Sequence, residues 1–202
     1  MIGVTGGLGS GKSTVSKILA AHLEAELTDT DELCRIHLQP GASGYEQVQK
    51  VLGQNYFLEN GELNREFLRQ QVFADDQIKE ILESILHPLV ERDVLAMQRR
   101  CNETGCHLVV EVPLLFEVGW QKYCETTVVV YVPEVICTDR VILRSGLSRQ
   151  AIKRIFSSQM DITDKRILAD YCIDNSGTYA STMQQVHWTG RSIIAKKRKQ
   201  LG

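Results

Sequence analysis

The sequence of 202 residues has no long apolar run and almost no excess of charge of either sign. Its longest apolar stretches, Val128 to Val132 and the residues around Val112, are too short or too interrupted to cross a bilayer. The net charge is −2, so the chain lacks the global basic character that duplex nucleic acid demands. It also opens without a basic and apolar signal segment. We therefore expect a cytoplasmic protein, monomeric or weakly homo-oligomeric, with neither a membrane nor a nucleic acid as partner.

Cysteine is present, but not in the spacing of a metal or disulfide framework. No C-x-x-C pair occurs among the six cysteines, Cys34, Cys101, Cys106, Cys124, Cys137 and Cys172. Cys101, Cys106 and His107 lie close together in the sequence, yet no second group of ligands with zinc spacing accompanies them. The pattern favours reduced thiols over a metal site.

Glycine is concentrated at the start of the chain. Gly6 to Ser13 fits G-x-x-x-x-G-K-S without a gap, after a strand-like Ile2 to Thr5 and before a helical pattern. Glycines let successive backbone N–H groups turn toward a polyphosphate, and the following helix adds its positive end. Lys12 is expected to reach the β- and γ-phosphates, and Ser13 to ligate Mg²⁺. The strand and helix context disfavours a glycine-rich turn that binds nothing.

Strand-like and helical segments alternate in the rest of the chain. We expect strands near residues 26–29, 108–112, 126–132 and 171–174, the middle two rich in β-branched residues, as in buried parallel sheets. These patterns predict an α/β fold of the P-loop NTPase type, a doubly wound parallel sheet with ligands at the carboxyl ends of its strands.

Helical patterns fill the remaining segments. Residues 32–106 are mostly helical, with helices expected at 45–52, 65–73, 77–86 and 88–100 and with a break or kink at His87-Pro88. Pro133 opens a helix to about Leu143, Ser148 caps one to about Met160, Thr163 caps a short one, and a last helix begins near Thr178. That helix ends in the basic run 196–199, which is typical of a solvated helix end.

Two aspartates follow the second predicted strand. Asp29 and Asp31 would lie at the same sheet edge as the phosphate-binding loop, where one of them could orient an attacking hydroxyl or accept its proton. Asp31 could instead cap the next helix. The pattern alone leaves both interpretations open.

Arginines gather on a later helix. Arg140 and Arg144 share one helix face, and the turn Ser145-Gly146 separates them from Arg149, Lys153 and Arg154. A closing lid uses such arginines because guanidinium groups pair with phosphate oxygens. A solvated surface helix would show the same pattern, so both interpretations stay open.

Two strand ends carry further acidic residues. Glu111 is expected to act through water on Mg²⁺. Asp174 to Gly177 matches the D-x-x-G of GTPases, but no N-K-x-D follows, so we interpret it as a turn near the base or sugar.

Short motifs recur along the chain in a specific order. They are Val4 to Thr14, Asp29-Thr30-Asp31 with Arg35, Asn64-Arg65 leading to Leu68 and Val72-Phe73, Leu86-His87-Pro88-Leu89, Val112-Pro113-Leu114-Leu115-Phe116-Glu117, Gln159, and Ala169-Asp170 leading to Ile173-Asp174-Asn175-Ser176-Gly177. From residue 2 to about 188 the chain thereby resembles the dephospho-coenzyme A (dephospho-CoA) kinases. The resemblance implies transfer of the γ-phosphoryl group of ATP to the 3′-hydroxyl of the ribose of dephospho-CoA, with Mg²⁺ as cofactor.

The resemblance also implies roles for particular residues. The catalytic residues would be Asp31, Lys12 and Arg140. ATP would contact Gly7, Leu8, Gly9, Ser10, Gly11, Lys12, Ser13, Thr14, Arg144, Asn175 and Gly177. The acceptor would contact Thr5, Asp31, Arg65, His87 and Leu114, and Mg²⁺ would be held by Ser13 with Glu111 acting through water. The expected parts are a nucleotide-binding core (1–31, 107–139 and 168–202), a helical acceptor domain (32–106) and a helical lid (140–167).

The chain departs from the family pattern at three positions. Thr30 replaces the usual alanine, Asn64 a frequent aspartate, and Cys137 a frequent glutamine. None of these changes touches Lys12, Asp31 or Arg140. Two other functions remain open at this stage: a nucleoside or nucleotide monophosphate kinase, and a nucleotide-dependent switch protein.

Overall fold

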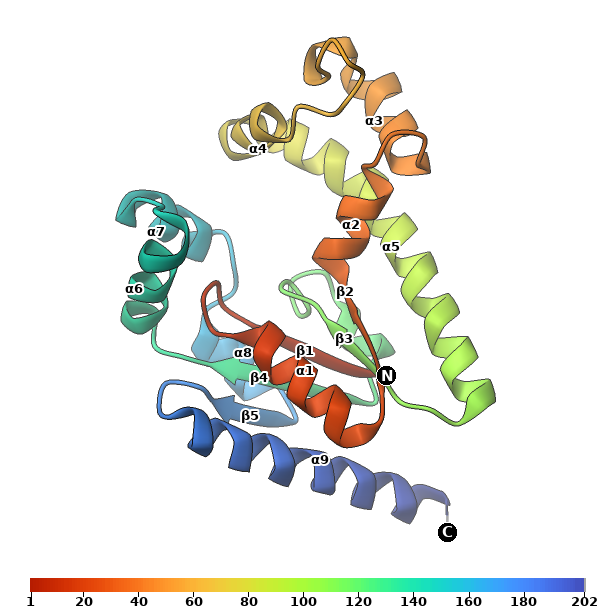
Figure 1. The fold of residues 1–202 in the computed structure, drawn as a ribbon, viewed down its shortest axis with the longest axis vertical. Coiled ribbons are helices and arrows are strands. Elements are labelled where there is room, and N and C mark those ends of the chain that lie inside the picture. Colours follow the sequence, from red (N-terminus) through yellow and green to blue (C-terminus); the bar gives the residue numbers. More distant parts are fainter. Residues whose placement is uncertain (202) are drawn as a thin grey trace. The chain divides into compact units, whose positions relative to one another are not determined.

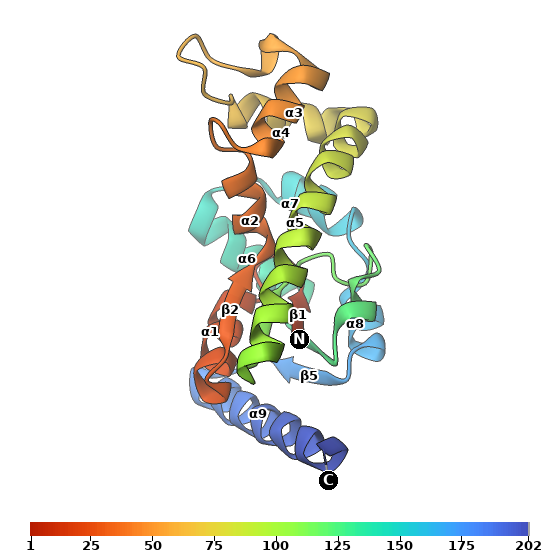
Figure 2. The same cartoon turned by 90° about the vertical axis from the view of Figure 1, so that its right-hand side faces the viewer.

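The computed structural model describes residues 1–201, with side chains as far as Lys197. The chain forms two compact units. The first unit comprises Met1–Asp29 and the chain from Arg100 onward, and the second comprises Thr30–Arg99. Figure 1 labels the elements, and Figure 2 gives a second view of the same ribbon.

Within residues 1–201, the five strands of the sheet all belong to the first unit. Its elements are β1 (Ile2–Gly6), α1 (Lys12–Leu23), β2 (Glu26–Asp29), β3 (Leu108–Glu111), η2 (Trp120–Tyr123), β4 (Thr126–Tyr131), α6 (Glu134–Ser145), α7 (Arg149–Ser157), α8 (Ile162–Leu168), β5 (Tyr171–Asp174) and α9 (Tyr179–Leu201). The strands form one sheet in the order β2-β3-β1-β4-β5, and every pairing is parallel. The α/β class and the doubly wound parallel sheet are therefore confirmed.

Register places the strand ends that matter at one edge of the sheet. Val4 pairs with Glu111, Asp29 pairs with Glu111 from the other side, and Gly6 pairs with Val130. Helices α1 and α9 lie side by side on one face of the sheet, and α8 lies on the opposite face (Figures 1 and 2). The core under α1 and α9 is aliphatic. Its residues include these fully buried ones: Val4, Val15, Leu19, Val128, Val130 and Val186.

The second unit is helical. Its elements are α2 (Thr30–His37), α3 (Ser43–Leu52), η1 (Gln54–Tyr56), α4 (Arg65–Ala74) and α5 (Asp76–Thr104), whose last residues, from Arg100, belong to the first unit. A separate core holds these helices together, built from Leu38, Val48, Leu63, Leu68, Ile85 and Leu86. The mostly helical character expected for this segment is confirmed.

The predicted break of the long helix at His87-Pro88 is wrong, while a kink there stays a prediction. Helix α5 runs from Asp76 to Thr104 with Pro88 inside it. A proline within a helix costs about 3 kcal/mol because it removes one hydrogen bond and crowds the preceding turn. Leu86 before it and Val90 after it are both buried, so packing on each side offsets that cost.

Capping residues refine the other helix predictions. Ser148 caps α7 as predicted, accepting a hydrogen bond from Ala151 N at 3.2 Å. The cap of α8 is Asp161 rather than Thr163, whose N–H donates to the Asp161 side chain at 2.7 Å. Helix α2 begins at Thr30, so Asp31 lies within its first turn and is not its N-cap.

The C-terminal helix α9 continues through the basic run. Lys196 is exposed and lies 3.8 Å from Asp170, while the side chains of Arg198 and Lys199 lie outside the described residues. Between residues 1 and 201, no helix combines the length and apolar character needed to cross a bilayer.

Candidate functional site

The loop between β1 and α1 has the backbone that a phosphate-binding loop requires. Gly9 and Gly11 have positive φ angles of 76° and 84°. A Cβ on Gly9 would lie 2.7 Å from Val141 Cγ2, and one on Gly11 would lie 2.4 Å from Asn175 Nδ2. Glycine is therefore required at both positions. Helix α1 has no side-chain N-cap, so the N–H groups of its first turn can bind an anion.

Lys12 and Ser13 begin that helix. The Lys12 ammonium donates hydrogen bonds to Gly6 O at 3.0 Å and Gly7 O at 3.1 Å, which holds its charge against the loop. Ser13 Oγ donates to Glu111 Oε1 at 3.0 Å. Glu111 is buried at the end of β3. A hydroxyl and a carboxylate are hard oxygen ligands, so these two residues fit Mg²⁺.

Asn175 connects the phosphate-binding loop to three other elements. Its side-chain amide donates to Ser10 O at 2.7 Å and accepts from Thr182 Oγ1 of α9 at 2.8 Å. Its backbone N–H donates to Tyr131 O at the end of β4, and its carbonyl accepts from Arg140 Nη2 at 3.0 Å. Asn175 therefore fixes the loop backbone and one arginine of α6 at the same time.

The arginine helix α6 lies against the same loop. Arg140 is half-buried, and Arg144, one turn later, is exposed before Gly146 ends the helix with a φ of 66°. Arg149 of α7 pairs with Asp139 at 2.9 Å on the surface. On its buried side, α6 presents Cys137, and burial raises the pKa of this thiol, which keeps it neutral behind the loop.

The segment after β3 is anchored by a buried lysine. Pro113 O accepts hydrogen bonds from Thr5 Oγ1 at 3.1 Å and from Lys165 Nζ at 2.9 Å. Lys165 is completely buried and also pairs with Glu117 Oε1 at 2.7 Å, which accepts from Met160 N at 2.9 Å. The segment that carries Leu114 is therefore tied to β1, to Met160 in the α7–α8 connection and to α8. Because Thr5 is fully buried, its effect on an acceptor would act through this segment.

Breaking this buried pair should destabilise the first unit strongly. In Lys165→Met, Glu117 would keep a largely buried charge without its cation, which costs about 3–5 kcal/mol in the free energy of unfolding. Urea unfolding followed by fluorescence of the buried Trp120 measures the loss. Adding Glu117→Gln to Lys165→Met should recover a large part of the lost free energy of unfolding. The control Lys122→Met, at an exposed lysine, should change the free energy of unfolding by less than about 1 kcal/mol. A loss of under 1 kcal/mol in Lys165→Met would contradict the anchoring role.

Three predicted acceptor residues belong to the second unit. Asp31 is exposed in the first turn of α2, and Arg35 lies one turn later on the same helix face. Arg65, the first residue of α4, is exposed and donates to Arg35 O at 3.4 Å. His87 is half-buried within α5. Within this unit, the structure thus brings Arg65 against the helix that carries Asp31.

Sequence reasoning missed two residues that shape the site. Lys165 has no motif around it and looks like a surface lysine of an amphipathic helix. Thr182 lies in the first turns of a long helix without a distinguishing pattern. Only their positions in the fold, beside Glu117 and Asn175, disclose what they do.

Known proteins resemble this chain over almost its whole length. A family model described as dephospho-CoA kinase matches residues 1–181. A dephospho-CoA kinase of Desulfotalea psychrophila is 37% identical over 197 residues, covering 98% of this chain and 99% of that protein. The structure of a dephospho-CoA kinase from Campylobacter jejuni has a TM-score of 0.71 at 27% identity, covering 97% of this chain and 98% of that one. A shikimate kinase from Acinetobacter baumannii shares the fold, with a TM-score of 0.52 at 18% identity and coverage of 97% and 93%.

Proposed function

Because this chain belongs to the dephospho-CoA kinase family, we propose that it transfers the γ-phosphoryl group of ATP to the 3′-hydroxyl of dephospho-CoA, giving CoA and ADP. The observation that carries this proposal is the family match over residues 1–181, because it spans the phosphate-binding loop and the whole helical second unit. A shared loop alone would support only a nucleotide site.

ATP binds at the carboxyl edge of the sheet in this proposal. Residues 7–14 surround its phosphates with backbone N–H groups, and Lys12 balances their charge. Ser13, with Glu111 acting through water, would hold Mg²⁺, and the ion would supply positive charge to the phosphate oxygens. Asn175 and Gly177 lie toward the base or sugar, supported by the bond between Asn175 and Ser10 O.

Asp31 serves the acceptor. Asp29 pairs in register with Glu111 at the carboxyl edge of the sheet, and Asp31 follows two residues later. Two residues of chain span at most about 7 Å, so covalent connection alone keeps Asp31 near that edge. Its carboxylate orients the ribose hydroxyl and takes its proton. Arg65 and Arg35 attract the acceptor's phosphates, and Thr5, His87 and Leu114 shape the pocket for the rest of it.

Arg140 and Arg144 supply charge as the phosphoryl group moves. Phosphoryl transfer depends mostly on positioning and electrostatic stabilisation, and planar guanidinium groups match phosphate oxygens. Residues 140–167 form the lid in this scheme, residues 32–106 the acceptor domain, and the remaining chain the nucleotide-binding core.

The six free cysteines suit a reducing cytoplasm, where we place the protein as a monomer or weak homo-oligomer.

A panel of acceptors tests the proposed reaction. Purified protein with ATP, Mg²⁺ and dephospho-CoA should form CoA and ADP in equal amounts, separated and counted by chromatography. Turnover with nucleosides or nucleoside monophosphates should be far slower. Faster turnover with one of these acceptors would favour the rival kinase function, and ATP hydrolysis unaffected by any acceptor would favour a switch. Folded protein that forms no CoA would reject the proposal.

A further inference from the structure

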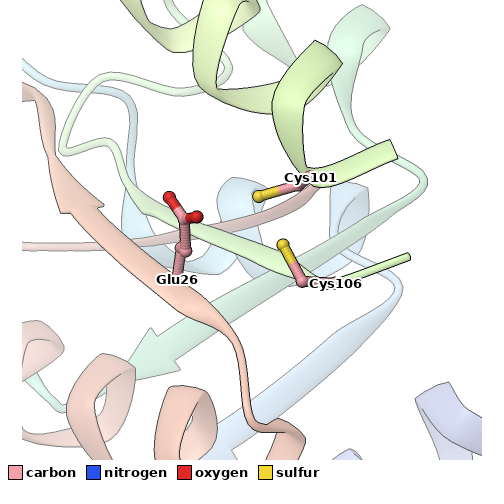
Figure 3. A group of neighbouring side chains, drawn as sticks. All are labelled: Glu26, Cys101 and Cys106. Carbon is pink, nitrogen blue, oxygen red and sulfur yellow. The ribbon is translucent and has the colours of Figure 1, made fainter. Parts of the chain in front are cut away.

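Three potential metal ligands converge in the first unit, away from the phosphate-binding loop. They are the Glu26 carboxylate and the Sγ atoms of Cys101 and Cys106, with ligand atoms that all lie within 4.8 Å of one another (Figure 3). Cys101 is fully buried and Cys106 is half-buried. The sequence favoured thiols without a metal because no second group of ligands with zinc spacing accompanies Cys101 and Cys106, whereas the structure brings Glu26 to them from far upstream.

The backbone holds these ligands in place. Helix α5 ends at Thr104, and Gly105 adopts a φ of 74° that turns the chain back. Cys106 thereby returns toward Cys101 in the last turn, and Thr104 Oγ1 donates to Cys106 Sγ at 3.4 Å. Glu26 opens β2, where its N–H donates to His107 O at 2.9 Å. The end of α5, the segment after it and the start of β2 therefore meet at one point, held by the turn at Gly105 and by the backbone hydrogen bond from Glu26 to His107.

We propose that Glu26, Cys101 and Cys106 bind a thiophilic divalent cation of the Zn²⁺ class, with water as fourth ligand. Thiolates with a carboxylate form a donor set that suits Zn²⁺ and suits Mg²⁺ poorly. Zn–S bonds of about 2.3 Å in a tetrahedron separate sulfur ligands by roughly 3.8 Å, so closing the cluster takes a movement of only about 1 Å.

The local charges balance once the ion is bound. Each thiol S–H bond breaks, its proton leaves to solvent, and the sulfur electron pair is donated to the metal. Two thiolates and one carboxylate carry −3, the ion carries +2, and Arg100, which is paired with Glu26, carries +1. This exposed guanidinium therefore completes a neutral site without blocking both carboxylate oxygens.

The position of the cluster assigns it a structural role. Glu26 and Leu108 begin paired parallel strands, so the cluster lies at the amino edge of the sheet, whereas the phosphate-binding loop lies at the carboxyl edge. A bound ion would join the last turn of α5 to the start of β2. We therefore expect it to stabilise the first unit without entering phosphoryl transfer.

Cobalt spectroscopy tests the proposal. Reduced, chelator-treated protein titrated with Co²⁺ should develop sulfur-to-cobalt charge-transfer absorption, saturating at one ion per chain. Zn²⁺ should displace Co²⁺ and raise the Tm. The Ser13 and Glu111 site contains only oxygen ligands, so it contributes no such absorption.

Two variants and a control make the test specific. Cys106→Ser should strongly diminish the charge-transfer absorption, because only the Cys101 sulfur is left to bind Co²⁺. It should weaken Zn²⁺ binding by more than about 100-fold, because loss of a direct ligand exceeds the usual 10–100-fold effect of outer-shell partners. Glu26→Gln should weaken Zn²⁺ binding at least about 10-fold but keep the charge-transfer absorption, because both sulfur ligands remain. Cys172→Ser, at another half-buried cysteine of the first unit, should bind as wild type does. Wild-type protein without the absorption in excess Co²⁺, or an absorption unchanged in Cys106→Ser, would overturn the proposal.

Discussion

Replacing Asp31 with asparagine should lower kcat by about 10²–10⁴-fold while leaving the KM for ATP close to that of the wild type. General-base groups contribute roughly this factor, and asparagine keeps the size and polarity of the side chain but cannot take a proton. Because Asp31 is exposed in the first turn of α2, the substitution removes no core packing. Steady-state kinetics with ATP and dephospho-CoA varied separately measure both constants.

A matched aspartate separates catalysis from helix stability. Asp76 is also exposed in the first turn of a helix of the second unit, so Asp76→Asn removes the same charge from the same helical setting. Loss of a favourable charge at a helix N-terminus costs about 0.3–1 kcal/mol in either variant. If both variants keep near-normal kcat, Asp31 acts only on its helix, and the proposed base must be sought elsewhere.

The sheet and the phosphate-binding loop could be predicted because their signals are local. β-branched runs such as Thr126 to Tyr131 form buried strands, and the glycine spacing of residues 6–13 permits few backbone conformations. Pro88 is a local signal too, but the helix end that it predicts is absent from α5. Packing of Leu86 and Val90 outweighs the cost of one lost hydrogen bond.

The contacts that stabilise the candidate site could not be predicted, because they join residues far apart in sequence. Lys165 meets Pro113 and Glu117 only after the sheet has formed, and nothing near it in the sequence marks it as buried. Glu26 likewise lies near Cys101 and Cys106 because β2 pairs with β3, which follows them, and sequence spacing does not reveal this. His37 had no informative setting in the sequence, but it is buried and lies 2.8 Å from Asp93.

Arg140→Ala should lower kcat by about 10³-fold or more, with a much smaller change in the KM for ATP. An arginine that stabilises the charge of the transferring phosphoryl group is worth about 10³–10⁵ in rate. Among residues 1–197, Arg140 donates one hydrogen bond, to the neutral carbonyl of Asn175. Loss of this charged hydrogen bond would lower the free energy of unfolding by about 1.5–3 kcal/mol at most, since Arg140 is only half-buried.

Two further variants distinguish a role of Arg140 in the transition state from a role in holding Asn175 and the phosphate-binding loop. Arg140→Lys keeps the charge without the planar fork, so it should recover only part of the rate. Arg191→Ala, at an exposed arginine of α9, should leave both constants unchanged. If Arg140 only held Asn175 and the loop behind it, Arg140→Ala would raise the KM for ATP and leave kcat nearly intact. A fall in kcat with ATP affinity preserved would instead place the action of Arg140 in the transition state, where charge on the phosphoryl oxygens is redistributed.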